Sequence, residues 1–574
     1  MLKDCLQIFQ DIYFEKGDRY VTDNYHLSEG SYVLVDEEGE IEKILEVGKR
    51  NLDTNDDYYF YFAQRNYLSQ LIGGLQKPID SSKKIHSNNY LSFFIKKQNI
   101  NRNILTSKIV DTYYNMLLNP LEKYKKDKKK MYQQVEDKYG KADAAAIEKY
   151  KNWIKENIYT ILDHVKNDKS YLKIFFKECI EDYIKESEKY VIPNIFNNTD
   201  YNKEINEVTF GLPNDNMGLN FKKPYLENKT RKNTLPYLIS TEEVMIQKKF
   251  FDYLMNYVSE GKNNIYLRKG KITCLSNEEA VEDGFAGYFL RIKKGKEVEI
   301  HDFDVITGIK ENIRGLTVDE TIPIQYGKGR EILDYIGEVE TISKLKGLIN
   351  VIYFNKFLTS NYFTDAKDIK LSDFRVKENL LKSRTAFFNW FYKGDSRVVK
   401  QIINKISMDL IKNSICNDYI LKAKEQFNLR YGLLRYFGGV ENMADILSGI
   451  VNNLRRKVNS SRTDKVDTDL EYYFAVGQIT SYLISLNKSS KKMHSLINPI
   501  INCKTDEGLK SEISKLFKKY NYVIRKENKK FNNLKAMILG YEAEGKIKED
   551  ILVAGYLYSN LIYESNRGEE IKNA

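Results

Sequence analysis

The chain has 574 residues, of which 42% are hydrophobic and 13% aromatic, so it is long enough for about two to four domains that each bury a core and too apolar for a disordered protein. Its formal net charge of +11 favours a polyanionic partner, although a chain rich in Lys, Asn, Ile and Tyr also fits an AT-rich genome. No stretch of about 18 apolar residues is present and no signal-peptide core follows the start, so we expect a cytoplasmic protein without membrane contact.

The first 120 residues mix a short amphipathic helical start with strand-like runs such as residues 31–35 and aromatic-rich helical segments. Residues 121–190 are predicted to be helical and highly charged, and the lysine run at 121–130 is typical of a solvated helix face. Residues 191–240 hold four of the eight prolines, which indicates a long ordered loop or a domain junction.

The middle of the chain begins with a predicted helix over residues 241–259, where Glu242 and Glu243 complement the helix dipole. Residues 264–310 alternate like strands and include a hairpin with its turn at residues 293–296. From about residue 380 the apolar residues recur at helical spacing, which predicts an antiparallel helical bundle. The spaced sets are Leu447, Val451, Leu454 and Val458; Tyr472, Val476, Ile479, Leu483 and Leu486; and Leu509, Ile513, Leu516, Tyr520 and Val523.

These elements predict an α+β protein, in which a mixed α/β N-terminal region with short antiparallel strands is followed by an all-helical C-terminal bundle. We expect a mixed domain over residues 1–240, a second mixed domain with the hairpin over residues 241–380, and the helical bundle over residues 381–574.

One stretch, EIHDFDVI at residues 299–306, raises the question of catalysis. In a strand, Asp302 and Asp304 share a face, as the carboxylates of two-metal enzymes can, whereas His301 lies on the other face. Further acidic ligands, a complete phosphate-binding glycine motif, a G-x-S-x-G elbow and a C-x-x-C pair are all missing. We therefore predict no catalytic residue, no metal and no cofactor, and keep a metal-dependent nuclease or nucleotidyltransferase using this pair as the alternative.

Three basic segments combine cations with amide and aromatic side chains, which suits contacts to phosphates, base edges and unpaired bases. Each also has a plainer interpretation: a loop entering a buried strand, a domain junction, or cations that complement a helix C-terminus. The candidate binding residues are Lys83, Lys84, Asn88 and Asn89 in the first segment; Asn220, Lys222, Lys223, Lys229, Arg231 and Lys232 in the second; and Arg455, Arg456, Lys457 and Arg462 in the third. A further basic stripe, at Lys518, Lys519, Arg525, Lys526, Lys529 and Lys530, lies on the same bundle as the third segment.

At these segments the chain resembles the large-subunit family of type I-B CRISPR surveillance (Cascade) complexes. The resemblance runs in order over nearly the whole chain, through KKIHSNNYLSFF at 83–94, KKPYLENKTR at 222–231, EIHDFDVI at 299–306, and the stretch from YYFAVGQ at 472–478 to KKFNNL at 529–534. Some relatives carry paired cysteines suited to zinc, and this chain departs from them because its cysteines lie singly.

The resemblance implies a non-catalytic subunit of an antiviral RNA-guided complex. It would bind the 5′ handle of the crRNA, recognise the PAM on target double-stranded DNA, support R-loop formation and recruit a separate helicase-nuclease, alongside other Cascade backbone and small subunits. The helical end would resemble the small subunit that holds displaced DNA. In this family that end can also be made separately by internal translation, for which Met408 and Met443 are conceivable starts.

On this interpretation the basic segments contact different parts of the nucleic acid. The cations of the second segment would contact the RNA handle or the PAM duplex, Asn88, Asn89 and Asn220 would read base edges, and Arg455, Arg456, Lys457 and Arg462 would contact the displaced or target strand. Besides the metal-dependent enzyme, a generic helical interaction scaffold stays open, and it predicts no salt-dependent binding of nucleic acid.

Overall fold

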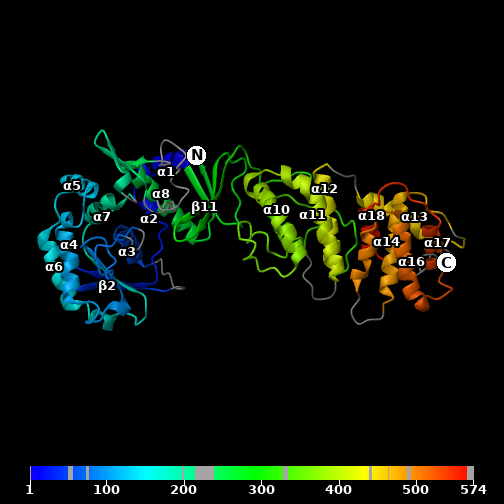
Figure 1. Ribbon diagram of the computed structural model, residues 1–574, viewed down its shortest axis with the longest axis horizontal. Helices are drawn as coiled ribbons and strands as arrows, with labels where there is room; N and C mark the ends of the chain where they lie inside the picture. Colours follow the sequence, from blue (N-terminus) through cyan, green and yellow to red (C-terminus); the bar gives the residue numbers. More distant parts are fainter. Residues whose placement is uncertain are drawn as a thin grey trace. The chain divides into compact units, whose positions relative to one another are not determined.

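The chain folds into two compact units, the first made of residues 1–276 and 287–305 and the second of residues 277–286 and 306–574 (Figure 1). Helices account for 52% and strands for 14%, and the described chain is helical from residue 342 on, which confirms the α+β class. This computed structural model describes residues 2–48, 56–72, 77–196, 199–213, 238–326, 334–438, 443–462, 464–487 and 493–564.

The expected domain boundaries after residues 240 and 380 do not coincide with these two units. The helix α8 (Thr241–Ser259) packs against α1 (Leu2–Lys16) and α2 (Arg19–Thr22), so residues on both sides of position 240 belong to the first unit. Position 380 falls inside the helix α10 (Phe374–Lys393). A proline-rich stretch and a change of hydrophobic period mark changes in local structure, and here neither marks the boundary between the two units.

A four-stranded sheet in the order β2-β1-β4-β3 forms the centre of the first unit. Most neighbours are antiparallel, as expected, but β1 runs parallel to β4, with Gly30 opposite Tyr171. A parallel pair requires a long crossover, and the helices between the two strands provide it. The strands are β1 (Gly30–Val35), β2 (Ile41–Val47), β3 (Ser92–Lys96) and β4 (Tyr171–Phe176).

Five helices share one hydrophobic core with this sheet, through aromatic residues such as Phe62, Tyr113 and Phe175. The helix α7 packs against α3 and α5, and α4 packs against α6. Their bounds are α3 (Asp57–Leu68), α4 (Ser107–Leu118), α5 (Asp127–Tyr139), α6 (Ala144–Asn157) and α7 (Ile180–Asn194).

The first unit has a second core, where α1 and α8 cover a sheet in the order β11-β10-β8-β9. The helix α8 has the predicted bounds, and Ser240 and Glu243 form a reciprocal capping box at its start. Short strands β5 (Lys203–Ile205), β6 (Val208–Gly211) and β7 (Ile239–Ser240) precede it. The strands of the second sheet are β8 (Asn264–Arg268), β9 (Lys271–Leu275), β10 (Gly287–Lys294) and β11 (Val298–Ile306), the last two forming the predicted hairpin.

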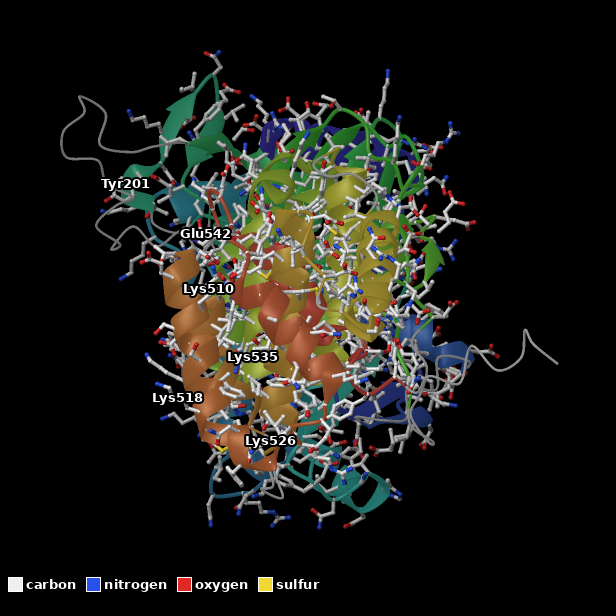
Figure 2. The ribbon with its side chains drawn as sticks, turned by 90° about the vertical axis from the view of Figure 1, so that its right-hand side faces the viewer. Tyr201, Lys510, Lys518, Lys526, Lys535 and Glu542 are labelled. Carbon is white, nitrogen blue, oxygen red and sulfur yellow. The ribbon has the colours of Figure 1, made fainter. Side chains whose placement is uncertain are left out.

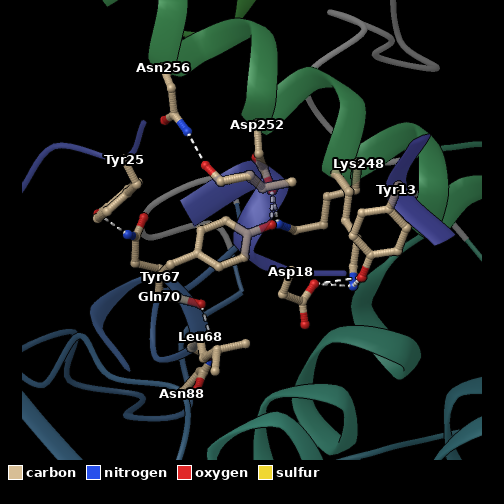
Figure 3. A network of polar contacts seen from close by, with 12 residues as sticks. Tyr13, Asp18, Tyr25, Tyr67, Leu68, Gln70, Asn88, Lys248, Asp252 and Asn256 are labelled. Atoms are coloured by element: carbon tan, nitrogen blue, oxygen red, sulfur yellow. Dashed lines mark hydrogen bonds and ion pairs between the residues drawn. The ribbon is translucent and has the colours of Figure 1, made fainter. Parts of the chain in front are cut away.

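Buried and half-buried polar contacts connect α8 to the start of the chain (Figure 3). Lys249 Nζ lies 2.7 Å from Asp18 Oδ1, and Asn256 Nδ2 donates to the backbone oxygen of Val21 at 2.8 Å. Asp252 accepts from Tyr67 of α3 at 2.8 Å. These contacts join the second core of the unit to the first.

The second unit begins with a short ribbon of β12 (Thr317–Val318) and β13 (Gly337–Glu338) and four helices. Of these helices, α11 packs on both α10 and α12, and α9 packs on α10 and α12. Their bounds are α9 (Ile342–Ile352), α10 (Phe374–Lys393), α11 (Arg397–Cys416) and α12 (Ile420–Tyr436).

The C-terminal helices pack around one hydrophobic core, as the helical spacing predicts. Every residue of the three spaced sets that lies inside a helix is buried, from Leu447 on the first helix to Tyr520 on the fourth. Leu486 lies just beyond the end of α14 and Val523 in the 3-10 turn after α16, where the α-helical spacing no longer determines burial. The helices are α13 (Met443–Asn459), α14 (Asp469–Ser485), α15 (Asn498–Ile501), α16 (Asp506–Tyr520), α17 (Lys529–Leu539) and α18 (Glu549–Leu557).

The helices α14 and α18 approach each other at backbone distance. A side chain at Gly477 would overlap the backbone oxygen of Leu552, and one at Gly555 would overlap the backbone oxygen of Phe474. Gln478 strengthens this crossing, because its Nε2 donates to the backbone oxygen of Gly555 at 2.6 Å. Since α14 and α18 are buried along nearly their whole length, this contact forms the centre of the bundle.

In the first core, no carboxylate among the described residues contacts the ammonium group of Lys173. Lys173 of β4 donates to Asn66 Oδ1 at 2.9 Å and to the hydroxyls of Ser28 and Tyr32 at 3.1 Å each. Burial lowers the pKa of this amine to about 7. In the unfolded chain the same amine has an ordinary pKa near 10.5.

We predict that Lys173 makes the first unit more stable as pH rises from about 7 to 9.5. Between the two pKa values the unfolded state binds one more proton than the folded state, so the free energy of unfolding gains up to about 1.4 kcal/mol per pH unit. The Lys173→Met variant should lose this part of the slope, and Lys108→Met, at an exposed position of α4, should keep it. Urea unfolding at a series of pH values, followed by Trp153 fluorescence in a Trp390→Phe background, measures how the free energy of unfolding changes with pH. Equal slopes in both variants would contradict a contribution from Lys173.

Candidate nucleic-acid interface

Asn88 and Asn89 of the first basic segment are buried, each with about 1% of its surface exposed. Asn88 Nδ2 donates to the backbone oxygens of Leu68 and Gln70 at 2.8 Å each (Figure 3). Asn89 donates to Ser69 Oγ, and its Oδ1 accepts from the backbone of Leu91 at 3.0 Å. The prediction that these two amides read base edges is therefore wrong for this structure, because the fold already uses their hydrogen bonds.

The two lysines of this segment lie in the turn before the buried strand β3. Lys83 is exposed and Lys84 is half-buried. The Asp80 carboxylate holds the turn by accepting from the backbone N–H groups of Lys84 and Ile85 at 2.6 and 3.0 Å. The interpretation as a loop that enters a buried strand thus accounts for most of the segment, and Lys83 presents its charge to solvent.

The second basic segment lies outside the described residues. Its candidates Asn220, Lys222, Lys223, Lys229, Arg231 and Lys232 fall within positions 214–237. Their roles at the RNA handle or PAM duplex stay predictions from the sequence.

In the third segment, Lys457 is buried inside the bundle, with 3% of its side chain exposed. Its amino group lies 2.8 Å from Glu471 Oε2 and 2.7 Å from Asp467 Oδ2. A lysine held by two carboxylates beneath the surface is not available to a DNA strand. The prediction that Lys457 contacts nucleic acid is wrong, since this cation closes an internal ion pair.

The arginines of the third segment differ in how far their charge is neutralised. Arg455 forms a bidentate pair with Glu564, through Nε at 2.8 Å and Nη2 at 3.1 Å. Arg456 keeps 68% of its side chain exposed, with Asp464 3.7 Å away. Arg462 is exposed in the loop after α13. The last two therefore present their charge to solvent.

The structure brings the end of α13 against the start of α17. Asn533 Nδ2 donates to the backbone oxygens of Val458 and Ser460 at 3.1 and 2.9 Å. Lys530 Nζ donates at 2.6 Å to the backbone oxygen of Glu564, the same residue that pairs with Arg455. The third segment and the α16–α17 turn, distant in sequence, therefore form neighbouring parts of one surface.

The α16–α17 turn carries a dense group of cations. Residues 515–530 contain seven Lys or Arg against one acidic residue, Glu527. Within the part of the chain that the structure describes, no carboxylate lies within 4.0 Å of Lys518, Lys519, Arg525, Lys526 or Lys529. All five side chains are exposed, and Figure 2 shows Lys518 and Lys526 at the same end of the α16–α17 pair.

An exposed aromatic ring stands among these cations. Tyr522 lies in the single 3-10 turn between α16 and α17, and 74% of its surface is exposed. The sequence alone does not single out this ring, because one tyrosine among 43 carries no signal of its own. We define the basic face as Arg456, Arg462, Lys518, Lys519, Tyr522, Arg525, Lys526 and Lys529.

The basic face combines the two kinds of group that hold unpaired nucleic acid. Ammonium and guanidinium groups neutralise phosphates, and an exposed ring offers a surface on which a base of any identity stacks. Such a face needs no pocket and reads little sequence. Its chemistry suits a single strand that passes over the turn.

Asp302 and Asp304 have a structural role in β11, an edge strand of its sheet. Asp302 Oδ1 accepts from the backbone N–H of Phe303, and Asp304 Oδ1 from that of Val305, at 2.8 Å each. Open N–H groups on a sheet edge invite pairing with another strand, so the two carboxylates make the edge less available. Among the described residues no group of three His, Cys, Asp or Glu side chains is placed to hold a metal ion.

None of the helices that the structure describes is both long and apolar enough to cross a membrane.

We predict that Lys457 and Arg456 contribute differently to stability, although they are adjacent. The Lys457→Met variant leaves Glu471 buried without its partner and should lose about 3–5 kcal/mol of unfolding free energy. Arg456→Met changes an exposed side chain and should stay within about 0.5 kcal/mol of the parent. Urea unfolding followed by far-UV circular dichroism measures both, and equal stability of the two variants would rule out the buried pair as a stabilising contact.

Comparison with known protein families, with curated proteins and with solved structures finds no match to this chain. Its function is therefore inferred from its own surfaces together with the sequence resemblance.

Proposed function

We propose that the chain is the non-catalytic large subunit of a type I-B CRISPR surveillance complex, acting in the cytoplasm. The observation that carries the proposal is the basic face, which joins two sequence segments into one surface of exposed cations around an exposed ring. The sequence resemblance supplies the kind of complex, and the basic face supplies a surface chemistry suited to nucleic acid.

In such a complex, base pairing with the guide RNA provides sequence specificity, and the protein subunits provide backbone contacts and strand separation. On this proposal the basic face holds the displaced or target strand, with cations on the phosphates and Tyr522 against a base. Lys83 and the second basic segment are the proposed contacts to the RNA handle and the PAM duplex. None of these roles needs a catalytic group.

The two conceivable internal starts differ in where they fall in the structure. Met443 is the first residue of α13, so a product that began there would contain α13 to α18 complete. Met408 lies in the middle of α11 and packs into the bundle core, so a product that began there would start inside a helix. We propose Met443 as the start of any separate small subunit.

Purification of the tagged chain from its native host at moderate salt tests the function as a whole. We expect short RNAs that share a repeat-derived 5′ end, together with partner proteins, and a smaller product whose mass corresponds to a start at Met443. The Met443→Leu variant should remove that product and Met408→Leu should not. A preparation with neither RNA nor partner proteins would contradict the proposed function.

The contribution of the basic face is tested by reversing three of its charges. The Lys518→Glu, Lys526→Glu, Lys529→Glu triple variant should bind single-stranded DNA at least about tenfold more weakly. Its plot of log affinity against log salt should be shallower by about 2, because each lost contact to a single strand removes about 0.7 from the slope. Fluorescence anisotropy over a salt series measures both quantities.

Two controls separate the basic face from general charge. The Lys367→Glu, Lys370→Glu, Lys400→Glu variant changes the net charge equally at exposed positions of the same unit and should keep the parent slope. Tyr522→Ala should weaken binding by about 1–3 kcal/mol and leave the salt slope unchanged, since stacking releases no counterions. An unchanged slope in the first triple variant would exclude the basic face as the phosphate contact.

A further inference from the structure

Two lysines of the first unit contact Asn194 at the end of α7, and a third contacts the loop that carries one of them. Lys77 Nζ donates to the backbone oxygen of Asn194 at 2.6 Å, and Lys128 Nζ donates to its Oδ1 at 3.0 Å. Lys123 Nζ donates to the backbone oxygen of Pro78, which follows Lys77 in the chain. Because these lysines come from a loop, a turn and the helix α5, the fold as a whole brings their amino groups together.

The contacts of Lys123 and Lys128 given above are to neutral oxygen atoms. Burial lowers the pKa of Lys123 to about 8; the nearby charge of Lys128 acts in the same direction and the Asp80 carboxylate opposes it. Burial also lowers the pKa of Lys128. Burial thus disfavours the charged form of both amines, and a bound anion would favour that form.

The nearby carboxylates are occupied by other groups. Asp80 accepts from the backbone N–H groups of the turn at Lys84 and Ile85. Glu186, in the small cavity that Lys123 also lines, lies 2.6 Å from the amino group of Lys189. Neither carboxylate forms an ion pair with Lys123 or Lys128, so the positive potential at the two amines is only partly offset, by Asp80.

The start of α5 adds to this potential. Its first turn places Lys128, Lys129 and Lys130 after Asp127, and no side chain caps the helix at Lys126. A helix N-terminus is itself partly positive, so lysines there are unfavourable and an anion is favourable. Glu204 lies 2.7 Å from the amino group of Lys130, which neutralises the end of the run farthest from Lys123.

We propose that Lys123 and Lys128, with Lys77 beside them, bind a phosphate group. Phosphate brings up to two negative charges and several acceptor oxygens to a site where amino groups converge from different directions. The lysine run at 121–130, which the sequence presents as a solvated helix face, would in part be this site. The ligand is either a phosphate of a nucleic-acid backbone or a free phosphate, and the site does not depend on the basic face.

Isothermal titration with pyrophosphate, at fixed ionic strength in chloride, tests the site in the full-length chain. The Lys123→Gln, Lys128→Gln double variant should bind at least about tenfold more weakly than the parent, because each charge-assisted hydrogen bond contributes that much. The Lys125→Gln, Lys129→Gln variant, at exposed positions of the same run, should bind like the parent. Absence of binding by the parent, or equal affinity in the two double variants, would overturn the proposal.

Two further measurements keep the test decisive. If the first double variant does not fold, as judged by far-UV circular dichroism, Lys128→Gln alone provides the comparison and Lys128→Arg should retain binding. Competition by a short single-stranded RNA, in the Lys518→Glu, Lys526→Glu, Lys529→Glu background, identifies the source of the phosphate. Displacement of pyrophosphate by the RNA indicates a nucleic-acid backbone, and displacement by orthophosphate alone indicates a free phosphate.

Discussion

The close crossing of α14 and α18 at Gly477 and Gly555 is the contact on which the C-terminal half of the molecule depends. It fixes α18, and with it Asp550 at the start of that helix, whose carboxylate lies 3.1 Å from the guanidinium of Arg430. It also fixes the chain after α18, where Glu564 joins Arg455 of α13 to Lys530 of α17. The helices α13 and α17, which carry part of the basic face, are thus linked through Glu564 to the chain that this crossing positions.

Some cations of the chain are enclosed by the fold, and others remain at the surface. Lys457 is enclosed with two carboxylates, and Lys173 is surrounded by hydroxyl and amide oxygens. Around Tyr522, by contrast, cations follow one another with little compensation. A net charge of +11 from 91 basic and 80 acidic residues is modest, so its effect on a polyanion depends on this uneven distribution.

Elements with a strong hydrophobic period could be predicted from the sequence. The bounds of α8 and the buried faces of α13, α14 and α16 follow from apolar spacing and from capping residues close by in the chain. The parallel pairing of β1 with β4 could not, because nothing in either strand specifies its neighbour.

The site residues show the same limit. The sequence does not distinguish a polar side chain that faces solvent from one that is buried with hydrogen-bond partners. The burial of Asn88 depends on backbone oxygens about twenty positions earlier, to which its amide donates. The burial of Lys457 depends on the Glu471 carboxylate fourteen positions later. Runs of cations were recognisable, whereas the importance of Tyr522 depends on the turn that exposes it.

The buried position of α18 has a consequence for synthesis of the protein. The ribosome synthesises α13 to α17 before α18. The apolar surface of α14 that α18 covers therefore stays exposed until α18 has left the ribosome. During that interval Phe474 and Val476, both fully buried in the finished bundle, face water or a chaperone. Completion of the bundle therefore waits for the synthesis of α18, and a product begun at Met443 would still carry both helices of the crossing.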